Sequence, residues 1–370
     1  MITIARAGCV ILAVAVGWVG LAGTLRVPGE FPTIQAALDA ASPGDVIEIA
    51  PGVYTEDLVI ARSVTLRADL VSLGLPPGKF LFPWELEPGI QIVGTGRQPA
   101  AVVVKGDVSV TLEFLTVAGG RVAALMVEGQ SRLTMRHAAI MKSNAIGILI
   151  RDWARVVLDA CLVARNPSYG VLLLDAAEIS LLNCVLVEKR GAALATSGSS
   201  RAEVIGSLIL NNFFYGISAG GSRSLTVRDS VIRGNGFAGL TVGGEGLIEV
   251  WRSTVSSNRF AGIHATGRAN LKLVENLIAD NQGSGVLFSG WWLTLEAVSN
   301  YVVRNSGYGF QVSNIVGVPL PPALVISVKV VGRENWVPEP GEPDGNRLGA
   351  LCPGIPGILD DPWPEGFLDP

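Results

Sequence analysis

Histidine is the side chain whose charge changes most readily near neutral pH, and the 370-residue chain contains two, His137 and His264. A histidine could act as a general base or bind copper. His264 belongs to a repeated segment, in which the equivalent positions one repeat before and after it hold Thr241 and Leu287. Neither is a carboxylate that could orient the imidazole. We therefore interpret His264 as a lone histidine on a surface groove with Thr241 beside it. His137 follows Arg136 in the sequence, and we assign it no function.

The carboxylates of the repeats are scattered rather than gathered into a catalytic set. Calcium-dependent lyases need several Asp or Glu oxygens at one place, because Ca²⁺ takes about six to eight oxygen ligands. Glycoside hydrolases place a pair of carboxyl groups at the bond that they cleave. The acidic residues of the repeats fall among turns, at Asp152, Asp159, Asp175, Asp229, Glu245, Glu249, Glu275, Asp280 and Glu296. The sequence therefore indicates no catalytic residues, and these stay unknown.

The sequence indicates no metal site. Copper requires several soft ligands that converge, and two separated histidines with Met126, Met135 and Met141 do not supply them. No CxxC pair and no Cys/His cluster occurs, which argues against structural zinc. We expect neither a metal nor a cofactor.

Aromatic residues give the clearer sign of ligand binding. Phe214, Phe237 and Phe260 recur at steps of 23 residues. Stacked phenylalanines could simply stiffen the fold, or they could form a ridge on which sugar rings stack. Trp291 and Trp292 follow a glycine in a predicted turn, where they are either exposed to glycan or buried in a corner of the fold. These five aromatic residues, the histidine and its threonine neighbour form the candidate ligand-binding set.

A repeat defines the elements that must position these residues. Asparagine followed by glycine and an aliphatic residue recurs, as in the segment Asn258–Ile263. The repeat glycines are Gly147, Gly170, Gly191, Gly216, Gly239, Gly262, Gly285 and Gly309. Their spacings are 23, 21, 25, 23, 23, 23 and 24 residues. Apolar residues alternate within the short segments between turns, for example Leu225 and Val227. This pattern predicts an all-β fold, a single-stranded right-handed parallel β-helix of roughly 11 coils that share one core.

Two columns of equivalent residues follow from this register. Five residues before each repeat asparagine stand small or polar residues that could form a hydrogen-bonded ladder at a turn, namely Ala139, Cys161, Cys184, Ser207, Ser230, Ser253, Asn276 and Asn300. The residues expected to point outward after the repeat glycines are Leu149, Leu172, Ala193, Ser218, Thr241, His264, Leu287 and Gln311. Cys161 and Cys184 are neighbours in the first column, where they could form a disulfide or simply pack.

The N-terminal segment differs in kind from the repeats. Residues 1–22 contain Arg6 and an apolar stretch from Val10 to Val19, and we interpret them as a signal peptide cleaved after Ala22; an uncleaved membrane anchor is the alternative. We therefore expect a secreted, periplasmic or cell-surface protein with no membrane span after cleavage. The net charge of -4 and the absence of a basic run argue against nucleic acid as a partner.

The remaining chain divides into two parts. Residues 23–316 form the predicted β-helix domain, and its N-terminal end is expected to be capped by a short helix between Thr33 and Ser42. Residues 317–370 are rich in proline and glycine. We expect this tail to cover the last coil; a linker or a partner-binding end is the alternative.

The segment Phe31–Leu38, followed by Ser42–Asp45 and Pro51–Glu56, resembles the opening of pectin-lyase-like β-helix proteins. The coils are similar to the parallel β-helix repeats of that superfamily. They especially resemble the NosD-like periplasmic family that assists nitrous-oxide reductase maturation and is often labelled copper-binding. The resemblance implies the fold over roughly residues 28–312. The superfamily includes lyases, hydrolases, esterases, epimerases, adhesins and phage tailspikes, so the fold does not define the function.

Three functions remain open from the sequence. The first is a secreted β-helix that binds glycan or another cell-envelope component without a recognisable catalytic site. The second is a polysaccharide lyase or hydrolase with an atypical site, and the third is a periplasmic NosD-like maturation or accessory protein. The first is favoured, because the repeats combine aromatic turns with no catalytic cluster.

Overall fold

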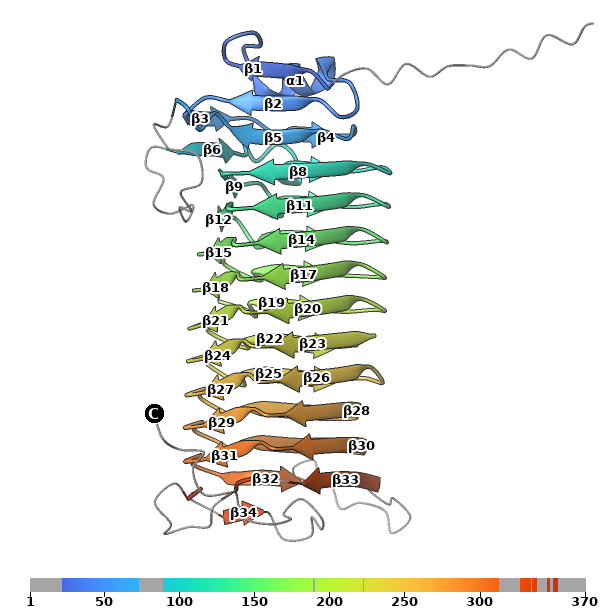
Figure 1. Cartoon of the computed structure of the whole chain (residues 1–370), viewed down its shortest axis with the longest axis vertical. Helices are drawn as coiled ribbons and strands as arrows, with labels where there is room; N and C mark the ends of the chain where they lie inside the picture. The colour runs from blue at the N-terminus through green and yellow to red at the C-terminus, as the bar shows by residue number, and fades with distance from the viewer. Residues whose placement is uncertain are drawn as a thin grey trace, which may run out of the picture.

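The computed structural model describes residues 22–72, 89–188, 190–221, 223–312, 327–333, 335–337, 345–346 and 349–351. They form a parallel β-solenoid of about 12 turns with one short helix at its N-terminal end (Figure 1). The predicted fold class is confirmed. Residues 1–21 of the predicted signal peptide lie outside the described residues. No helix in the described part of the chain is long and apolar enough to cross a membrane.

The strands stack into three faces. The first face contains β4 (Leu58–Ile60), β7 (Ala100–Val104), β10 (Ala123–Val127), β13 (Ile146–Ile150), β16 (Val171–Leu173), β19 (Leu194–Thr196), β22 (Ile217–Gly220), β25 (Leu240–Gly243), the first halves of β28 (Ile263–Val274) and β30 (Val286–Val298), β32 (Tyr308–Val312) and β34 (Gly349–Leu351). The second face contains β1 (Thr24–Val27), β2 (Val46–Ile49), β5 (Thr65–Ala68), β8 (Ser109–Glu113), β11 (Arg132–Arg136), β14 (Arg155–Asp159), β17 (Glu178–Leu182), β20 (Arg201–Ile205), β23 (Ser224–Arg228), β26 (Leu247–Trp251), the second halves of β28 and β30, and β33 (Ser327–Arg333). The third face contains β3 (Gly52–Thr55), β6 (Ile90–Val93), β9 (Leu115–Gly119), β12 (Ala139–Ser143), β15 (Leu162–Ala164), β18 (Val185–Val187), β21 (Leu208–Leu210), β24 (Val231–Arg233), β27 (Thr254–Ser256), β29 (Leu277–Ala279) and β31 (Tyr301–Val303).

Strands of successive turns pair in parallel and in register. On the first face Ile217 pairs with Leu240, and Leu240 pairs with Ile263 on the following turn. Within β25, Leu240 and Val242 are buried in the core, whereas Thr241 is half-buried on the outer side. Equivalent residues therefore lie one above another along the axis, as the repeat predicts, and each strand sends alternate side chains into one continuous core.

One turn corrects the register that the glycines predicted. Leu194 pairs with Val171 on the preceding turn, so Ala193 and not Gly191 occupies the repeat-glycine position, and the 23-residue step is kept. The outward position predicted for Ala193 therefore belongs to Ala195, and Ala193 itself is buried. Gly191 predicts the wrong register because the register depends on which aliphatic side chain packs in the core. In this turn that side chain is Leu194.

A ladder of buried asparagines runs along the turn between the third and first faces. The side-chain N–H of Asn258 donates to the Asn281 carboxamide oxygen at 2.9 Å, and the same contact recurs between the other neighbours. The ladder consists of Asn212, Asn235, Asn258, Asn281, Asn305 and Asn346. Near the N-terminal end, the backbone N–H of Ser143 donates to the Asn166 carboxamide oxygen, and Asn144 is exposed. Ser143 therefore occupies the repeat position that the sequence analysis assigned to Asn144.

A second ladder follows the turn between the second and third faces. The Cys184 backbone N–H donates to the Ser207 hydroxyl at 3.0 Å, and the pattern continues to the C-terminal end. Its hydrogen-bonded members are Cys184, Ser207, Ser230, Ser253, Asn276, Asn300 and Asn335. The predicted ladder is confirmed from Cys184 to Asn300. Cys161 lies one turn before Cys184, and Ala138 rather than Ala139 lies one turn before Cys161, because the Ala138 carbonyl accepts from Leu162 as the Cys161 carbonyl accepts from Val185.

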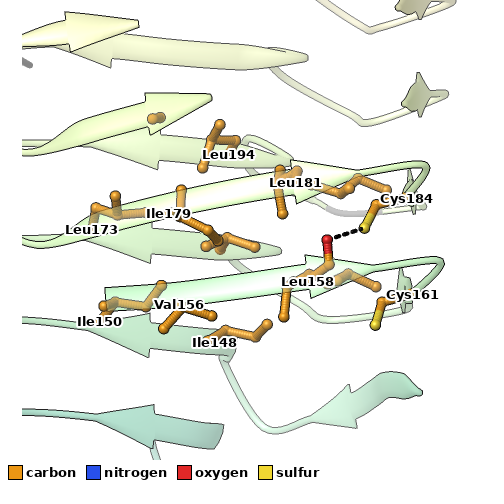
Figure 2. Packing of buried hydrophobic residues seen from close by; sticks show 14 of the residues in the cluster. Ile148, Ile150, Val156, Leu158, Cys161, Leu173, Ile179, Leu181, Cys184 and Leu194 are labelled. Carbon is orange, nitrogen blue, oxygen red and sulfur yellow. Dashed lines mark hydrogen bonds between the residues drawn. The ribbon is translucent and has the colours of Figure 1, made fainter. Parts of the chain in front are cut away.

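Cys161 and Cys184 are buried free thiols and form no disulfide. The Cys184 thiol donates to the Leu158 carbonyl at 3.4 Å, and the Cys161 thiol donates to the Asp159 carbonyl at 3.3 Å. Figure 2 places both sulfurs at the end of rows of aliphatic side chains that include Leu158 and Leu181. The two cysteines therefore pack in the core, which was one of the two arrangements open from the sequence.

The predicted capping helix is confirmed as α1 (Ile34–Ala40), which closes the N-terminal end of the solenoid (Figure 1). Thr33 caps it through its hydroxyl. The carboxylate of Glu56 accepts hydrogen bonds from the backbone N–H groups of Ile34 and Gln35, both at 3.0 Å. Glu56 lies in a segment that resembles β-helix openings, so in this chain that segment holds the cap together.

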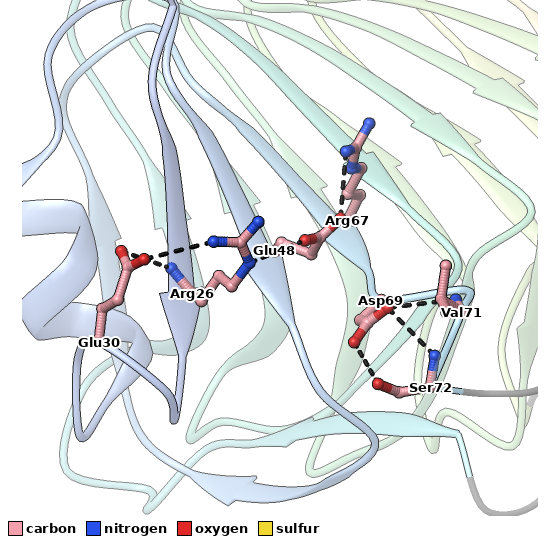
Figure 3. A network of polar contacts seen from close by, with 7 residues as sticks. All are labelled: Arg26, Glu30, Glu48, Arg67, Asp69, Val71 and Ser72. Carbon is pink, nitrogen blue, oxygen red and sulfur yellow. Dashed lines mark hydrogen bonds and ion pairs between the residues drawn. The ribbon is translucent and has the colours of Figure 1, made fainter.

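Ion pairs cross the first strands of the second face. Arg26 contacts Glu30 at 3.4 Å and Glu48 at 3.6 Å, and Arg67 contacts Glu48 at 3.1 Å (Figure 3). These side chains lie at the surface, where each pair contributes little to stability. Together they link β1, β2 and β5 at the N-terminal end of this face.

The described parts of the C-terminal tail continue the solenoid. β33 pairs with β30, and β34 pairs with β32. Asn300 donates to Asn335 at 2.9 Å, and Asn305 donates to Asn346 at 3.0 Å. These parts of the tail therefore pack on the last turns, whereas the predicted boundary between residues 316 and 317 lies outside the described residues.

Candidate functional site

His264 contacts a serine on the next turn of the first face. Its Nε2 lies 2.6 Å from the Ser289 hydroxyl oxygen, whereas its Nδ1 is buried and has no hydrogen-bond partner among the described residues. Burial lowers the pKa of the imidazole below its ordinary value, so His264 is neutral at pH 7. A neutral imidazole can both donate and accept a hydrogen bond.

Thr241 lies directly beside His264 in the sheet register, as the sequence predicts. Its hydroxyl oxygen is buried and also has no partner in the described part of the chain. Ser218 precedes Thr241 in the same outward column. Two neighbouring buried polar atoms without partners are costly, and a ligand that hydrogen-bonds to them would remove that cost.

Aromatic rings form an unbroken chain that leads to this histidine. The rings of Phe237 and Phe260 stack with their centroids 4.4 Å apart, and Phe260 meets His264 edge to face at 5.6 Å. On the preceding turn, Tyr215 meets Phe237 at 5.3 Å. Phe214 meets Tyr215 at 6.0 Å and Phe213 at 5.6 Å. We call Phe213, Phe214, Tyr215, Phe237 and Phe260 the aromatic ridge.

The ridge faces outward and is not part of the core. Phe213 and Phe214 are 67% and 48% exposed, and Phe237 and Phe260 are half-buried. The turns that carry them are held by backbone bonds between coils, such as that from the Phe237 N–H to the Phe214 carbonyl at 2.8 Å. The structure therefore brings together five of the seven predicted site residues and adds Phe213, Tyr215 and Ser289 to them.

Trp291 and Trp292 lie on β30, where the backbone of Trp292 pairs with that of Arg268. They follow the first-face half of a continuous strand rather than a turn. Their side chains lie outside the described residues, so their contact with a ligand stays a prediction.

The second face has an aromatic residue that the sequence analysis did not single out. Arg228 lies 5.6 Å from the ring centroid of Trp251, and Lys272 lies 5.3 Å from it. Lys272 also pairs with Glu296 at 3.0 Å. Because two cations already lie against its indole, Trp251 offers less open surface than the aromatic ridge. The sequence contains a signal for part of this cluster, because Arg228 and Trp251 are separated by one 23-residue repeat and are therefore neighbours in the sheet.

The chemistry open to the first face is limited by its charges. Among the described residues, the outward column that contains Thr241 and His264 holds no carboxylate and no lysine or arginine, and the imidazole of His264 is neutral at pH 7. A two-carboxylate hydrolysis cannot be placed there. Within the described ranges, no three His, Cys, Asp or Glu side chains gather where they could hold a metal ion. The arrangement suits stacking and hydrogen bonding of a neutral polar ligand.

Comparisons with known proteins agree with the fold. The A-module of the mannuronan C-5 epimerase AlgE4 from Azotobacter vinelandii is similar over 89% of this chain and 95% of its own, with 16% identity and a TM-score of 0.60. A double mutant of the periplasmic alginate epimerase AlgG is similar over 79% of this chain and 72% of its own, with 13% identity and a TM-score of 0.52. A search of curated proteins finds no match.

The sequence family described as "Right handed beta helix region" matches residues 95–230 and 220–317. These two matches span more than half of the chain and include every turn of the aromatic ridge. They do not single out the NosD-like branch that the repeats resemble. The chain therefore belongs to the right-handed parallel β-helix family.

Proposed function

We propose that this chain is an exported β-helix that binds glycan along its first face. The aromatic ridge stacks against sugar rings, and His264, Thr241 and Ser289 hydrogen-bond to sugar hydroxyls at one end of it. The observation that carries the proposal is the continuous series of ring contacts that ends at two buried polar atoms without partners.

Glycan fits this surface better than a purely apolar ligand does. A sugar presents C–H groups on its ring face and hydroxyls at its edge, so it needs aromatic surface and hydrogen-bonding groups side by side. Phe260 and His264 provide that combination within one turn. A hydroxyl can donate and accept, so it can satisfy both the Nδ1 of His264 and the hydroxyl of Thr241.

Two further points support this function. Two solved structures with the same fold are named as an epimerase of alginate and an epimerase of mannuronan. Residues 1–22 have the pattern of a signal peptide, which agrees with a ligand outside the cytoplasm.

A glycan array followed by calorimetry on the strongest ligand tests the proposal. We expect Phe237→Ala and Phe260→Ala each to weaken binding by about tenfold, since each removes a stacking surface. Leu247→Ala is the matched control, because Leu247 is an exposed apolar residue of the second face. Binding by both phenylalanine variants at wild-type strength, or no array ligand at all, contradicts the proposal.

A polysaccharide lyase is the second candidate, and the contact between His264 and Ser289 favours it. A neutral imidazole at pH 7 can remove a proton from a substrate carbon. Release of unsaturated sugar ends from a polysaccharide panel, lost in His264→Ala and kept in Leu247→Ala, would place this activity above binding alone. The absence of product with any polysaccharide would leave the binding function.

A further inference from the structure

An exposed tryptophan occupies the turn between the first and second faces, away from the aromatic ridge. Trp153 is 67% exposed, although tryptophan is usually well covered by its own chain. Its turn is fixed by three backbone contacts. The Trp153 N–H donates to the Gly129 carbonyl at 3.0 Å, the Gly129 N–H donates to the Asp152 carboxylate at 2.8 Å, and the Asp152 N–H donates to Asp175 at 3.1 Å. The indole is therefore presented to solvent from a rigid backbone.

Trp153 forms one wall of an open pocket. The pocket has a volume of ≈ 310 Å³ and is lined by Gln130, Arg132, Trp153 and Arg155. This volume lies at the lower end of the range for small-ligand sites, which is about 300 to 1,000 Å³. One aromatic surface, two guanidinium groups and one carboxamide therefore converge on a space of suitable size.

The two arginines of this pocket are directly paired in the sheet. Arg132 and Arg155 occupy the same register position on β11 and β14, and like charges in that arrangement destabilise a sheet. Arg155 has Glu178 at 3.0 Å, whereas Arg132 has Asp107 only at 3.8 Å, and that aspartate is 73% exposed. A ligand anion between the two guanidinium groups would remove the repulsion, and guanidinium binds carboxylate or sulfate through paired N–H groups.

We propose that this pocket is a second glycan site, specific for an anionic sugar. The sugar ring stacks on the indole of Trp153, its acidic group accepts hydrogen bonds from Arg132 and Arg155, and Gln130 hydrogen-bonds to a hydroxyl. The site differs in chemistry from the aromatic ridge, which ends at the neutral imidazole of His264, whereas two guanidinium groups line this pocket. It follows from the pocket alone and does not depend on the function proposed for the ridge.

Calorimetry on the full chain tests this proposal with a short oligogalacturonate as the carboxylated probe. We expect Trp153→Ala and Arg132→Ala each to weaken binding by about tenfold or more, and Trp153→Phe to keep most of it. Arg165→Ala is the charge-matched control, since Arg165 is also exposed and ion-paired, with Glu188 at 3.1 Å on another face. Binding in Arg132→Ala should depend less steeply on salt than in the wild type, because one charge contact is lost.

Other probes define the ligand class. A sulfated oligosaccharide of the same length distinguishes recognition of sulfate from recognition of carboxylate. If the oligogalacturonate or the sulfated oligosaccharide binds more tightly than a neutral cello-oligosaccharide does, the result supports an anionic-sugar site. Equal binding of the neutral probe overturns the proposal, and so does tighter binding of a single-stranded oligonucleotide, which would assign the pocket to nucleic acid. Wild-type affinity in both Trp153→Ala and Arg132→Ala also overturns it.

The two glycan proposals fail separately. If Phe237→Ala and Phe260→Ala lose binding to their array ligand while Trp153→Ala binds oligogalacturonate normally, the ridge is a site and the pocket is not. If only Trp153→Ala and Arg132→Ala lose binding, the pocket is a site and the ridge is structural. Thermal unfolding of each variant confirms that these surface changes leave the fold intact.

Discussion

The imidazole Nε2 of His264 lies 2.6 Å from the hydroxyl of Ser289 on the next turn, and this contact determines what the other ring nitrogen can do. If Ser289 donates, Nδ1 carries the proton and is a buried donor; if Nε2 donates, Nδ1 is a buried acceptor. In both cases a polar atom beside Thr241 is left for a ligand. The first face therefore has hydrogen-bonding groups next to the aromatic ridge, which lies in the turns that lead into this face.

We predict that His264 titrates below the ordinary histidine pKa of about 6.5, because burial disfavours its charged form. The unfolded chain then takes up this proton at a higher pH than the folded chain does. The stability that His264 contributes is complete above about pH 6.5 and is lost as the pH falls through the folded-state pKa. An NMR titration of the imidazole measures the midpoint directly.

Phe260→Ala is the matched variant for this titration. Phe260 meets the imidazole edge to face, so its removal exposes the ring to water and should raise the midpoint towards the ordinary value. A wild-type midpoint at or above the ordinary value would show that burial does not control this histidine.

The asparagine ladder should be a main source of stability. Asn258 is fully buried; its carboxamide accepts from Asn235 and donates to Asn281, both at 2.9 Å. Asn258→Ala leaves several buried polar groups without partners, and we expect the free energy of unfolding to fall by about 2 to 4 kcal/mol. Urea unfolding followed by circular dichroism measures the change.

Asn144→Ala is the control for the ladder. The sequence assigns Asn144 to the same repeat position, but the structure exposes it and gives that place in the turn to Ser143. Its replacement should change the free energy of unfolding by less than about 0.5 kcal/mol. Equal losses in the two variants would mean that the ladder adds nothing beyond an ordinary surface asparagine.

The fold could be predicted from the sequence because the solenoid repeats one local rule. The 23-residue step, the alternation within strands and the helix cap at Thr33 all depend on residues close in sequence or separated by one fixed period. The prediction failed at Ala193, where the glycine signal lies two residues away from the true repeat position. Gly191 is the nearest glycine, and it was assigned to the repeat position. The register is instead set by Leu194, whose side chain packs in the core.

The candidate site could be predicted only in part. Thr241, His264 and the three spaced phenylalanines follow from the period. Ser289 meets His264 across 25 residues, which is one period plus two positions along the strand, so no column of equivalent residues pairs them. The pocket at Trp153 depends on which way four side chains point from a turn and a strand, and periodicity carries no information about that.

The N-terminal cap should depend on Glu56. Its carboxylate accepts from the first backbone N–H groups of α1, where negative charge also interacts favourably with the helix dipole. We expect Glu56→Ala to cost about 1 to 2 kcal/mol and to speed hydrogen exchange at Ile34 and Gln35. Glu30→Ala removes an exposed ion pair with Arg26 and a hydrogen bond from the Arg26 backbone N–H, neither of which involves α1, so it should leave that exchange unchanged. Similar hydrogen-exchange rates at Ile34 and Gln35 in both variants would show that Glu56 does not stabilise the cap.

The two core cysteines should resist modification in the folded protein. A hydrogen bond with the Cys184 side chain and burial raise the pKa of the Cys161 thiol well above its ordinary value, so little reactive thiolate is present at pH 8. Alkylation at that pH, mapped by mass spectrometry, should label Cys161 and Cys184 slowly in native protein and rapidly in urea.

Ser199→Cys gives the internal standard for this experiment, because Ser199 is exposed on a turn of the same solenoid and its thiol should react at once in native protein. Reaction of Cys161 at the rate of this standard would mean that the second-face turn opens readily. A disulfide between Cys161 and Cys184 in the purified protein would contradict the structure, where each thiol donates to a backbone carbonyl; Figure 2 shows the bond from Cys184 to Leu158. Slow labelling in native protein would mean that the two thiols react only when the core opens. The labelling rate would then report the local stability of the turns that contain Cys161 and Cys184, which lie around the coil between the pocket at Trp153 and the aromatic ridge.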